Sequence, residues 1–222
     1  MNLGDDKALY LLPFDHRQSY LTDMFHFKTP LTVPQRDQVI DSKQLIHDAI
    51  RAAAFEPRVQ RAVAYDVFFD AFDCNLRLMP TSTRRVLLLL LRLKLDVLVN
   101  ALARRAAKRS LVIEWGLNQA MHVTGTATPA AYLQAIQRYT AAEISGRVTQ
   151  DVLLLAGTED HDVPLAQFHQ QIAALTNTPS LTARLFTRAE SAQSHCQAGN
   201  FGLALQVITA WLDSQAARAQ KS

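Results

Sequence analysis

The fold is decided by the segment DVLLLAGTEDHDVP, residues 151–164. Its residues 152–156 form an unbroken apolar run that ends at Gly157, a pattern typical of a strand buried on both faces of a parallel sheet. The polar residues 158–162 follow directly, and parallel sheets place their chemistry in loops at the carboxyl ends of their strands. The segment therefore predicts a strand over 151–157 followed by a candidate functional loop.

Outward from this strand, the hydrophobic pattern alternates between strands and helices. Residues 58–66 and 181–186 predict two further strands, and residues 164–175 and 201–217 show the periodicity of helices. An order in which strands alternate with helices predicts an α/β fold with a parallel sheet.

A long helical insert separates the first two of these strands, from about residue 68 to 146. Thr128 followed by Pro129 predicts an N-cap and a proline in the first turn of a helix. The main helical segments are expected at 87–102, 111–121 and 130–142.

Composition excludes several classes of protein. The 222 residues carry a net charge of +3, and the basic residues are dispersed rather than gathered on one stripe, which argues against nucleic-acid binding. The most apolar stretch, residues 86–102, is interrupted by Arg92, Lys94 and Asp96, whereas a membrane-spanning helix needs about 20 nearly uncharged residues. With 49% hydrophobic residues, a globular protein without nucleic-acid or membrane partners is expected.

The N-terminus and the cysteines indicate a cytoplasmic protein. Residues 1–7 are acidic and polar, unlike the start of a signal peptide. Cys74 and Cys196 lie far apart, so reduced thiols are expected rather than a metal motif. The histidines and acids of residues 161–169 also lack the spacing of metal ligands. We therefore expect no cofactor and no metal.

A second candidate loop, ESAQSHC at residues 190–196, follows the strand at 181–186. An acid in the first loop and His195 one strand later can form a pair in which the carboxylate accepts the imidazole Nδ1 proton. This contact sets the tautomer, stabilises the imidazolium and leaves Nε2 as a general base for a hydroxyl. The first loop offers three acids, Glu159, Asp160 and Asp162.

The two loops resemble the acid turn and the histidine loop of the α/β-hydrolase superfamily. The pattern Gly157-x-x-Asp160-x-x-Val163-Pro164 is similar to the acid turn of that family, and His195 precedes the terminal helix as the family's histidine does. The resemblance covers residues from about 50 to 222 and only the second half of the family's fold. It implies that Asp160, rather than its acidic neighbours, is the triad acid and that His195 is the catalytic histidine.

The same resemblance implies a helical cap at about residues 73–146, which in this family shapes the substrate pocket. Candidate residues that line the pocket are Trp115, His122 and His161. The implied substrate or ligand is a small molecule with an acyl-type bond, such as an ester or amide.

The nucleophile of the family is missing. No Gly-x-Ser-x-Gly occurs, and between Gly4 and Gly116 there is no glycine at all, although the strained turn around the serine needs small residues. Ser42 falls on a helix expected over 36–55 and is interpreted as a surface residue. Hydrolysis by this chain alone is therefore not expected.

Two hypotheses from different classes follow. The first is a hydrolase by descent that keeps the acid and the histidine of the triad. The second is a non-catalytic binding or interaction module that keeps the pocket. In either case, the sheet edge left by a truncated fold is expected to be open to pairing, including self-association.

The first 49 residues are of a different kind. Residues 9–20, LYLLPFDHRQSY, and 40–46 resemble the first strand and helix of a β/α-barrel aldolase that acts on 2-deoxy-5-keto-gluconate 6-phosphate. Asp15, His16 and Arg17 would lie at the catalytic face of such a barrel. A single β/α unit cannot close a barrel, so no aldolase activity is implied. The expected architecture is a truncated α/β-hydrolase sheet with a helical cap at residues 50–222, preceded by one foreign β/α unit at 1–49.

Overall fold

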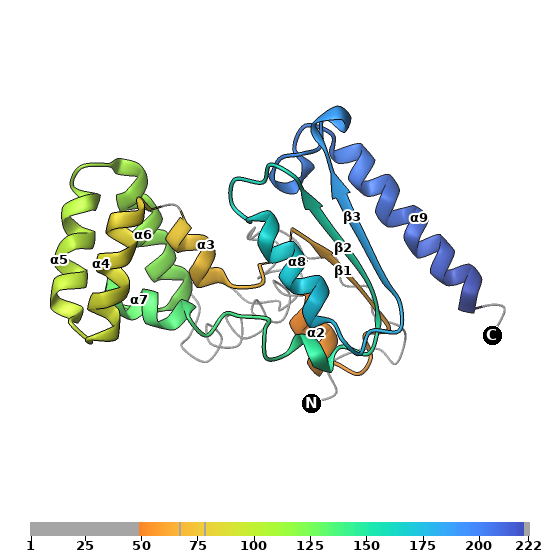
Figure 1. Ribbon diagram of the computed structural model, residues 1–222, viewed down its shortest axis with the longest axis horizontal. Coiled ribbons are helices and arrows are strands. Elements are labelled where there is room, and N and C mark those ends of the chain that lie inside the picture. The colour runs from red at the N-terminus through yellow and green to blue at the C-terminus, as the bar shows by residue number, and fades with distance from the viewer. Residues whose placement is uncertain (1–48, 67, 78, 220–222) are drawn as a thin grey trace, which may run out of the picture. The chain divides into compact units, whose positions relative to one another are not determined.

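The structure, a computed structural model, describes residues 49–66, 68–77 and 79–219 (Figure 1). The aldolase-like residues 9–20 and 40–46 and most of the helix expected at 36–55 lie outside the described residues. The chain divides into two compact units. We call them the sheet unit, with described residues 49–66 and 141–219, and the helical unit, with described residues between 68 and 140.

The sheet unit contains a three-stranded parallel sheet in the order β1-β2-β3, so the fold is mixed α/β. The strands are β1 (Arg61–Tyr65), β2 (Asp151–Gly157) and β3 (Leu181–Phe186). The predictions for β2 and β3 are confirmed at both ends. β1 is shorter than the predicted 58–66.

The central position of β2 explains its sequence. β2 pairs with a neighbour on each side, and Val152, Leu153, Leu154 and Leu155 are all 0% exposed. Both faces of the sheet are covered, by α9 (Phe201–Ala219) on one face and by α2 (Ala49–Phe55) and α8 (Leu165–Ala174) on the other (Figure 1). A strand enclosed in this way is apolar at every position rather than at alternate positions.

One buried cluster joins the sheet to α9. It contains the β2 residues whose side chains face this helix, the end of β3 and the inner side of α9. Its fully or almost fully buried members are Leu153, Leu155, Phe186, Ala192, Ala204, Ile208 and Trp211.

The helical unit contains five α-helices in its described residues: α3 (Ala71–Arg77), α4 (Thr81–Arg92), α5 (Asp96–Ala107), α6 (Leu111–Thr124) and α7 (Pro129–Ile136). Their shared core contains Leu76, Leu87, Val99, Ala130, Tyr132, Leu133 and Ile136. The N-cap predicted at Thr128 is confirmed, because its Oγ1 accepts a hydrogen bond from the Ala131 amide and Pro129 follows in the first turn. The insert expected to form a cap, about 73–146, overlaps this unit.

Two predicted helices differ from the structure. The segment 87–102 is not one helix, because α4 ends at Arg92 and α5 begins at Asp96, with Lys94 in the left-handed region at φ 56°. Glycine is the usual residue at such a helix end, so periodicity alone gave no sign of the break. The segment 130–142 is also too long, since α7 ends at Ile136 and Thr140 forms an isolated antiparallel bridge with Asp70. Among the described residues, no helix is long and apolar enough to cross a membrane.

Candidate functional site

The candidate site lies at the carboxyl ends of the three strands. Asp66 directly follows β1, Asp160 lies in the loop after β2, and His195 lies in the loop after β3. Because parallel strands end at the same edge of the sheet, these loops meet there. Asp160 and His195 were predicted as a pair; Asp66 was not predicted to belong to the site.

Asp160 and His195 are in direct contact. The Oδ2 atom of Asp160 lies 2.9 Å from Nδ1 of His195. Oδ1 of the same carboxylate accepts hydrogen bonds from the backbone amides of Asp162 (2.8 Å) and Val163 (2.9 Å). Both carboxylate oxygens are therefore occupied, and the turn holds the carboxylate in one orientation toward the imidazole.

Burial and hydrogen bonding have opposite effects on the pKa values of Asp160 and His195. Burial raises the pKa of Asp160, but the hydrogen bonds from His195 and from the two amides together hold the pKa below its ordinary value. The hydrogen bond to Asp160 raises the pKa of His195, against the opposing effect of burial, and the charges of Asp160, Asp66 and Asp162 add to the rise. The pair therefore favours a carboxylate next to an imidazole that binds its proton more tightly than an ordinary histidine.

Gly157 allows the histidine loop to cross the end of β2. A Cβ at this position would lie 2.2 Å from the Gln193 carbonyl oxygen and 2.9 Å from that of Ser194. The same Gln193 oxygen accepts a hydrogen bond of 2.8 Å from the Glu159 amide. The glycine therefore ends the strand and also lets the two loops approach closely enough for Asp160 to reach His195.

Asp66 is the second acid at the imidazole. It is only 5% exposed, and its Oδ2 lies 3.8 Å from Nδ1 of His195. The carboxylate accepts hydrogen bonds from the Cys196 amide and from Nε2 of Gln197 (3.2 Å). Burial raises the pKa of Asp66, and the charge of Asp160 raises it further. Its sequence signal was its position as the first polar residue after the apolar strand 61–65.

The backbone around His195 is held in an uncommon conformation. His195 begins a short 3-10 turn, η4 (His195–Gln197), in which Cys196 and Gln197 have positive φ angles of 50° and 46°. Asp66 also has a positive φ, 52°. Non-glycine residues in this region cost about 1–3 kcal/mol each and persist where surrounding contacts enforce them. One such contact is the hydrogen bond of 2.7 Å from the Tyr65 hydroxyl to the Cys196 carbonyl.

The other side of the imidazole faces Asp162 and His161. Nε2 of His195 lies 3.8 Å from Oδ2 of Asp162, and the rings of His161 and His195 are 6.0 Å apart. The His195 side chain is 26% exposed, against 74% for His161. The imidazole of His195 is therefore partly open to solvent.

The remaining predicted pocket residues lie in the helical unit. Trp115 and His122 are both on α6 and are exposed, with 69% of Trp115 accessible to solvent. Whether they line a pocket together with His195 stays a prediction.

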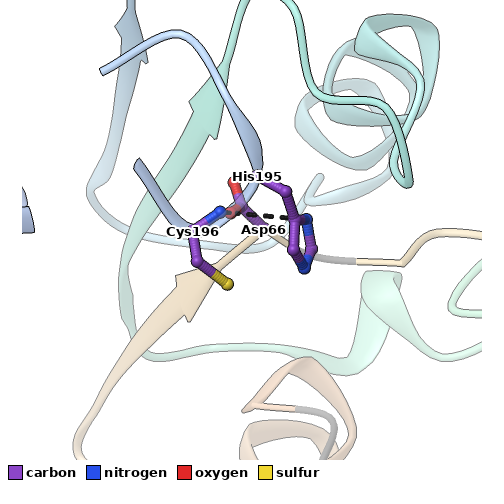
Figure 2. A group of neighbouring side chains, drawn as sticks. All are labelled: Asp66, His195 and Cys196. Carbon is purple, nitrogen blue, oxygen red and sulfur yellow. Dashed lines mark hydrogen bonds and ion pairs between the residues drawn. The ribbon is translucent and has the colours of Figure 1, made fainter. Parts of the chain in front are cut away.

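Two groups of side chains at this edge have the donor atoms of a metal site. Asp66, His195 and Cys196 form one group, shown in Figure 2, and Asp160, Asp162 and His195 form the other. In each group, one potential ligand atom per residue lies within 4.8 Å of the others. Spacing along the chain did not reveal these groups, because their members come from loops that only the sheet brings together.

Comparison with known proteins adds no family. No family model matches the sequence, and no curated protein matches it. Among solved structures, the chain is similar to AbyA5, with a TM-score of 0.48 and 17% sequence identity. The similarity covers 77% of this chain and 40% of AbyA5, so the chain spans less than half the length of that protein.

Proposed function

We propose that Asp160 and His195 are the acid and the base of an α/β-hydrolase-type site that acts on an ester, an amide or a related acyl bond. The observation that carries the proposal is the 2.9 Å contact between Asp160 Oδ2 and His195 Nδ1. The two residues follow neighbouring parallel strands, in the chain order acid then histidine that this superfamily uses. The three strands would then be the last part of the hydrolase sheet, and the helical unit inserted between β1 and β2 would be its cap.

The chemistry follows from the tautomer. Asp160 accepts the Nδ1 proton, so the lone pair of neutral His195 lies on Nε2, the atom on the side of Asp162 and His161. Nε2 removes a proton from the attacking oxygen as that oxygen adds to the acyl carbon, and Asp160 stabilises the imidazolium that forms. The proton then passes from Nε2 to the leaving group, and the base is restored.

The attacking oxygen is the part that the chain does not supply in the usual way. The sequence lacks Gly-x-Ser-x-Gly, so the base acts on water or on a hydroxyl that another chain contributes. Without the strained serine, only weak catalysis remains, because most of the rate of a triad enzyme is lost with its nucleophile.

The test is hydrolysis of p-nitrophenyl acetate and butyrate by the purified chain. We expect slow release of nitrophenol that depends on the unprotonated form of His195. His195→Ala should lower the rate by about 10²-fold, the usual contribution of a general base. The control is His169→Ala, an exposed histidine on α8, which should leave the rate unchanged.

Equal rates for the wild type and His195→Ala would overturn the proposal. If acyl compounds then raised the melting temperature of the wild type without being turned over, the chain would be a binding module instead. This alternative is favoured by one observation, the absence of the serine motif from a sequence that keeps the acid turn and the histidine loop.

A further inference from the structure

We infer that Asp66, His195 and Cys196 form a binding site for a zinc ion (Figure 2). The site goes beyond the proposed hydrolytic function, because it uses Nδ1 of His195, the sulfur of Cys196 and the carboxylate of Asp66. Among these three, only the histidine belongs to the proposed acid–base pair.

The donor atoms fit a zinc ion in kind. Zinc is bound in proteins by imidazole nitrogen, thiolate sulfur and carboxylate oxygen, and this group offers one of each. Mixed nitrogen, oxygen and sulfur donors favour zinc over magnesium or calcium, which prefer oxygen ligands alone.

The donor atoms also fit in distance. With zinc–ligand bonds of about 2.0–2.3 Å, neighbouring donors of a tetrahedral ion lie roughly 3.3–3.8 Å apart. Nδ1 of His195 and Oδ2 of Asp66 are already 3.8 Å apart, and all three donors lie within 4.8 Å of one another. Cys196 immediately follows His195 on the same turn, so a rotation of its side chain can bring the sulfur closer to the other two donors.

The electrostatic surroundings favour a cation. Three carboxylates, Asp66, Asp160 and Asp162, lie within 4 Å of a ring nitrogen of His195. Within the part of the chain that the structure describes, the ion pairs of these three acids are all with histidine. A divalent ion would neutralise the excess negative charge of this edge.

A buried oxygen next to the group is a second, independent indication. Gln197 is 0% exposed, and its Nε2 donates to Oδ1 of Asp66. Its Oε1 is buried and has no hydrogen-bond partner among the described residues. Buried acceptors without a partner are uncommon in folded proteins, and an ion or its bound water is one of the accepted explanations.

Binding zinc breaks two bonds to hydrogen. The Sγ–H bond of Cys196 breaks, its proton passes to the buffer, and a bond from Sγ to zinc forms. The Nδ1–H bond of His195 also breaks, and its hydrogen bond to Asp160 is lost. The imidazole stays neutral because a proton from solvent forms an Nε2–H bond, and the Nδ1 lone pair binds the ion. In that state Nε2 cannot accept a proton, so bound zinc would block the base that the proposed function requires.

The test is a titration of the metal-free chain with Co²⁺, which replaces zinc and reports its ligands by absorption. We expect visible bands of a tetrahedral ion together with a near-ultraviolet thiolate-to-cobalt charge-transfer band, and loss of both when zinc is added. Cys196→Ser should remove the charge-transfer band. Cys74→Ser is the matched control, since this buried cysteine lies on α3 in the helical unit, and it should keep the band.

Asp66→Asn should weaken Co²⁺ binding about tenfold or more. Circular dichroism of each variant checks the fold. Even if Asp66→Asn does not fold, the comparison of wild type, Cys196→Ser and Cys74→Ser shows whether Cys196 binds the ion. A wild type without a charge-transfer band, or a band that survives in Cys196→Ser, would overturn the inference. These spectra need no ester hydrolysis, so failure of the zinc site and failure of the proposed function are separate results.

Discussion

β2 in the sheet unit and α6 in the helical unit are both rich in apolar residues, yet they use them in opposite ways. In β2 the run from Val152 to Leu155 is completely buried. In α6 no described residue is buried, and Leu111, Val112 and Trp115 are 82%, 77% and 69% exposed. Apolar composition therefore does not decide burial by itself.

The difference arises from how each element is covered. A central strand of a parallel sheet has neighbours at both edges and helices on both faces, so all of its side chains leave water. A helix in contact with neighbours on one side, as α6 is with α5 and α7, covers only that stripe, and in α6 Ala120 and Met121 are partly buried there. The buried positions of β2 and the exposed positions of the helical unit should consequently respond very differently to truncation of an apolar side chain.

The largest effect is expected from truncating the core of the sheet unit. Leu153→Ala removes a side chain that is 0% exposed and packs in the same cluster as Trp211, so we expect a loss of about 2–5 kcal/mol in unfolding free energy. Urea unfolding followed by Trp211 fluorescence, in a Trp115→Phe background, reports this unit specifically.

The matched control is Val97→Ala on α5, a valine that is 80% exposed. It should change the unfolding free energy by less than about 0.5 kcal/mol. Similar losses in unfolding free energy for both variants would show that the contrast between buried β2 and the exposed positions of the helical unit is wrong.

A smaller effect, of opposite sign in the two units, is expected from glycine-to-alanine substitutions. Gly157→Ala places a Cβ against the Gln193 carbonyl and should cost about 1–3 kcal/mol while separating Asp160 from His195. Gly116→Ala on α6 meets no atom within 4 Å and should stabilise its helix by about 0.5–1 kcal/mol. Thermal unfolding measures both, and a Gly157→Ala variant as stable as the wild type would contradict the close approach of the two loops.

The smallest effect is expected on the pKa of His195, when its carboxylate partner Asp160 is replaced. Asp160→Asn removes the main cause of the raised pKa of His195, so the titration midpoint of this histidine should move to lower pH in an NMR titration. Asp213→Asn, on the exposed side of α9, serves as the control and should leave the midpoint where it is.

The raised pKa of His195 also determines how the unfolding free energy changes with pH. His195 has a folded-state pKa above its unfolded value, so its contribution is complete below about pH 6.5 and is lost as pH rises through the folded pKa. The difference in unfolding free energy between the wild type and Asp160→Asn should therefore narrow as pH rises through that range. A difference that widened would mean that Asp160 does not stabilise the imidazolium.

Local sequence patterns predicted the strands well and the helix ends less well. β2 and β3 were predicted to the residue, because β2 contains an apolar run that ends at a glycine and β3 is a short segment with β-branched and aromatic residues. The break between α4 and α5 was missed because Lys94 takes a left-handed conformation there. Glycine or asparagine usually occupies such a position, so a lysine gave no indication that the helix ends.

The residues of the candidate site were also predicted only in part from the sequence. Asp160 and His195 could be paired from the sequence, because each follows a strand and the order of acid and histidine is informative. Asp66 also directly follows a strand, but nothing near it in the chain indicates that β1 lies beside β2 with Asp66 against the histidine turn, so neither Asp66 nor Cys196 was added to the site. That neighbourhood depends on strand order, which is a long-range property.

The sequence by itself determined the α/β class, two of the three strands and the acid–histidine pair, because these depend on periodicity and on residue order along the chain. The tertiary structure alone decided that a second buried acid, Asp66, and the thiol of Cys196 lie beside the same imidazole, and that the buried amide of Gln197 donates to this acid. The physical reason is that parallel strands bring together loops that are up to about 130 residues apart in the chain, so the groups that perturb His195 become its neighbours only when the sheet forms.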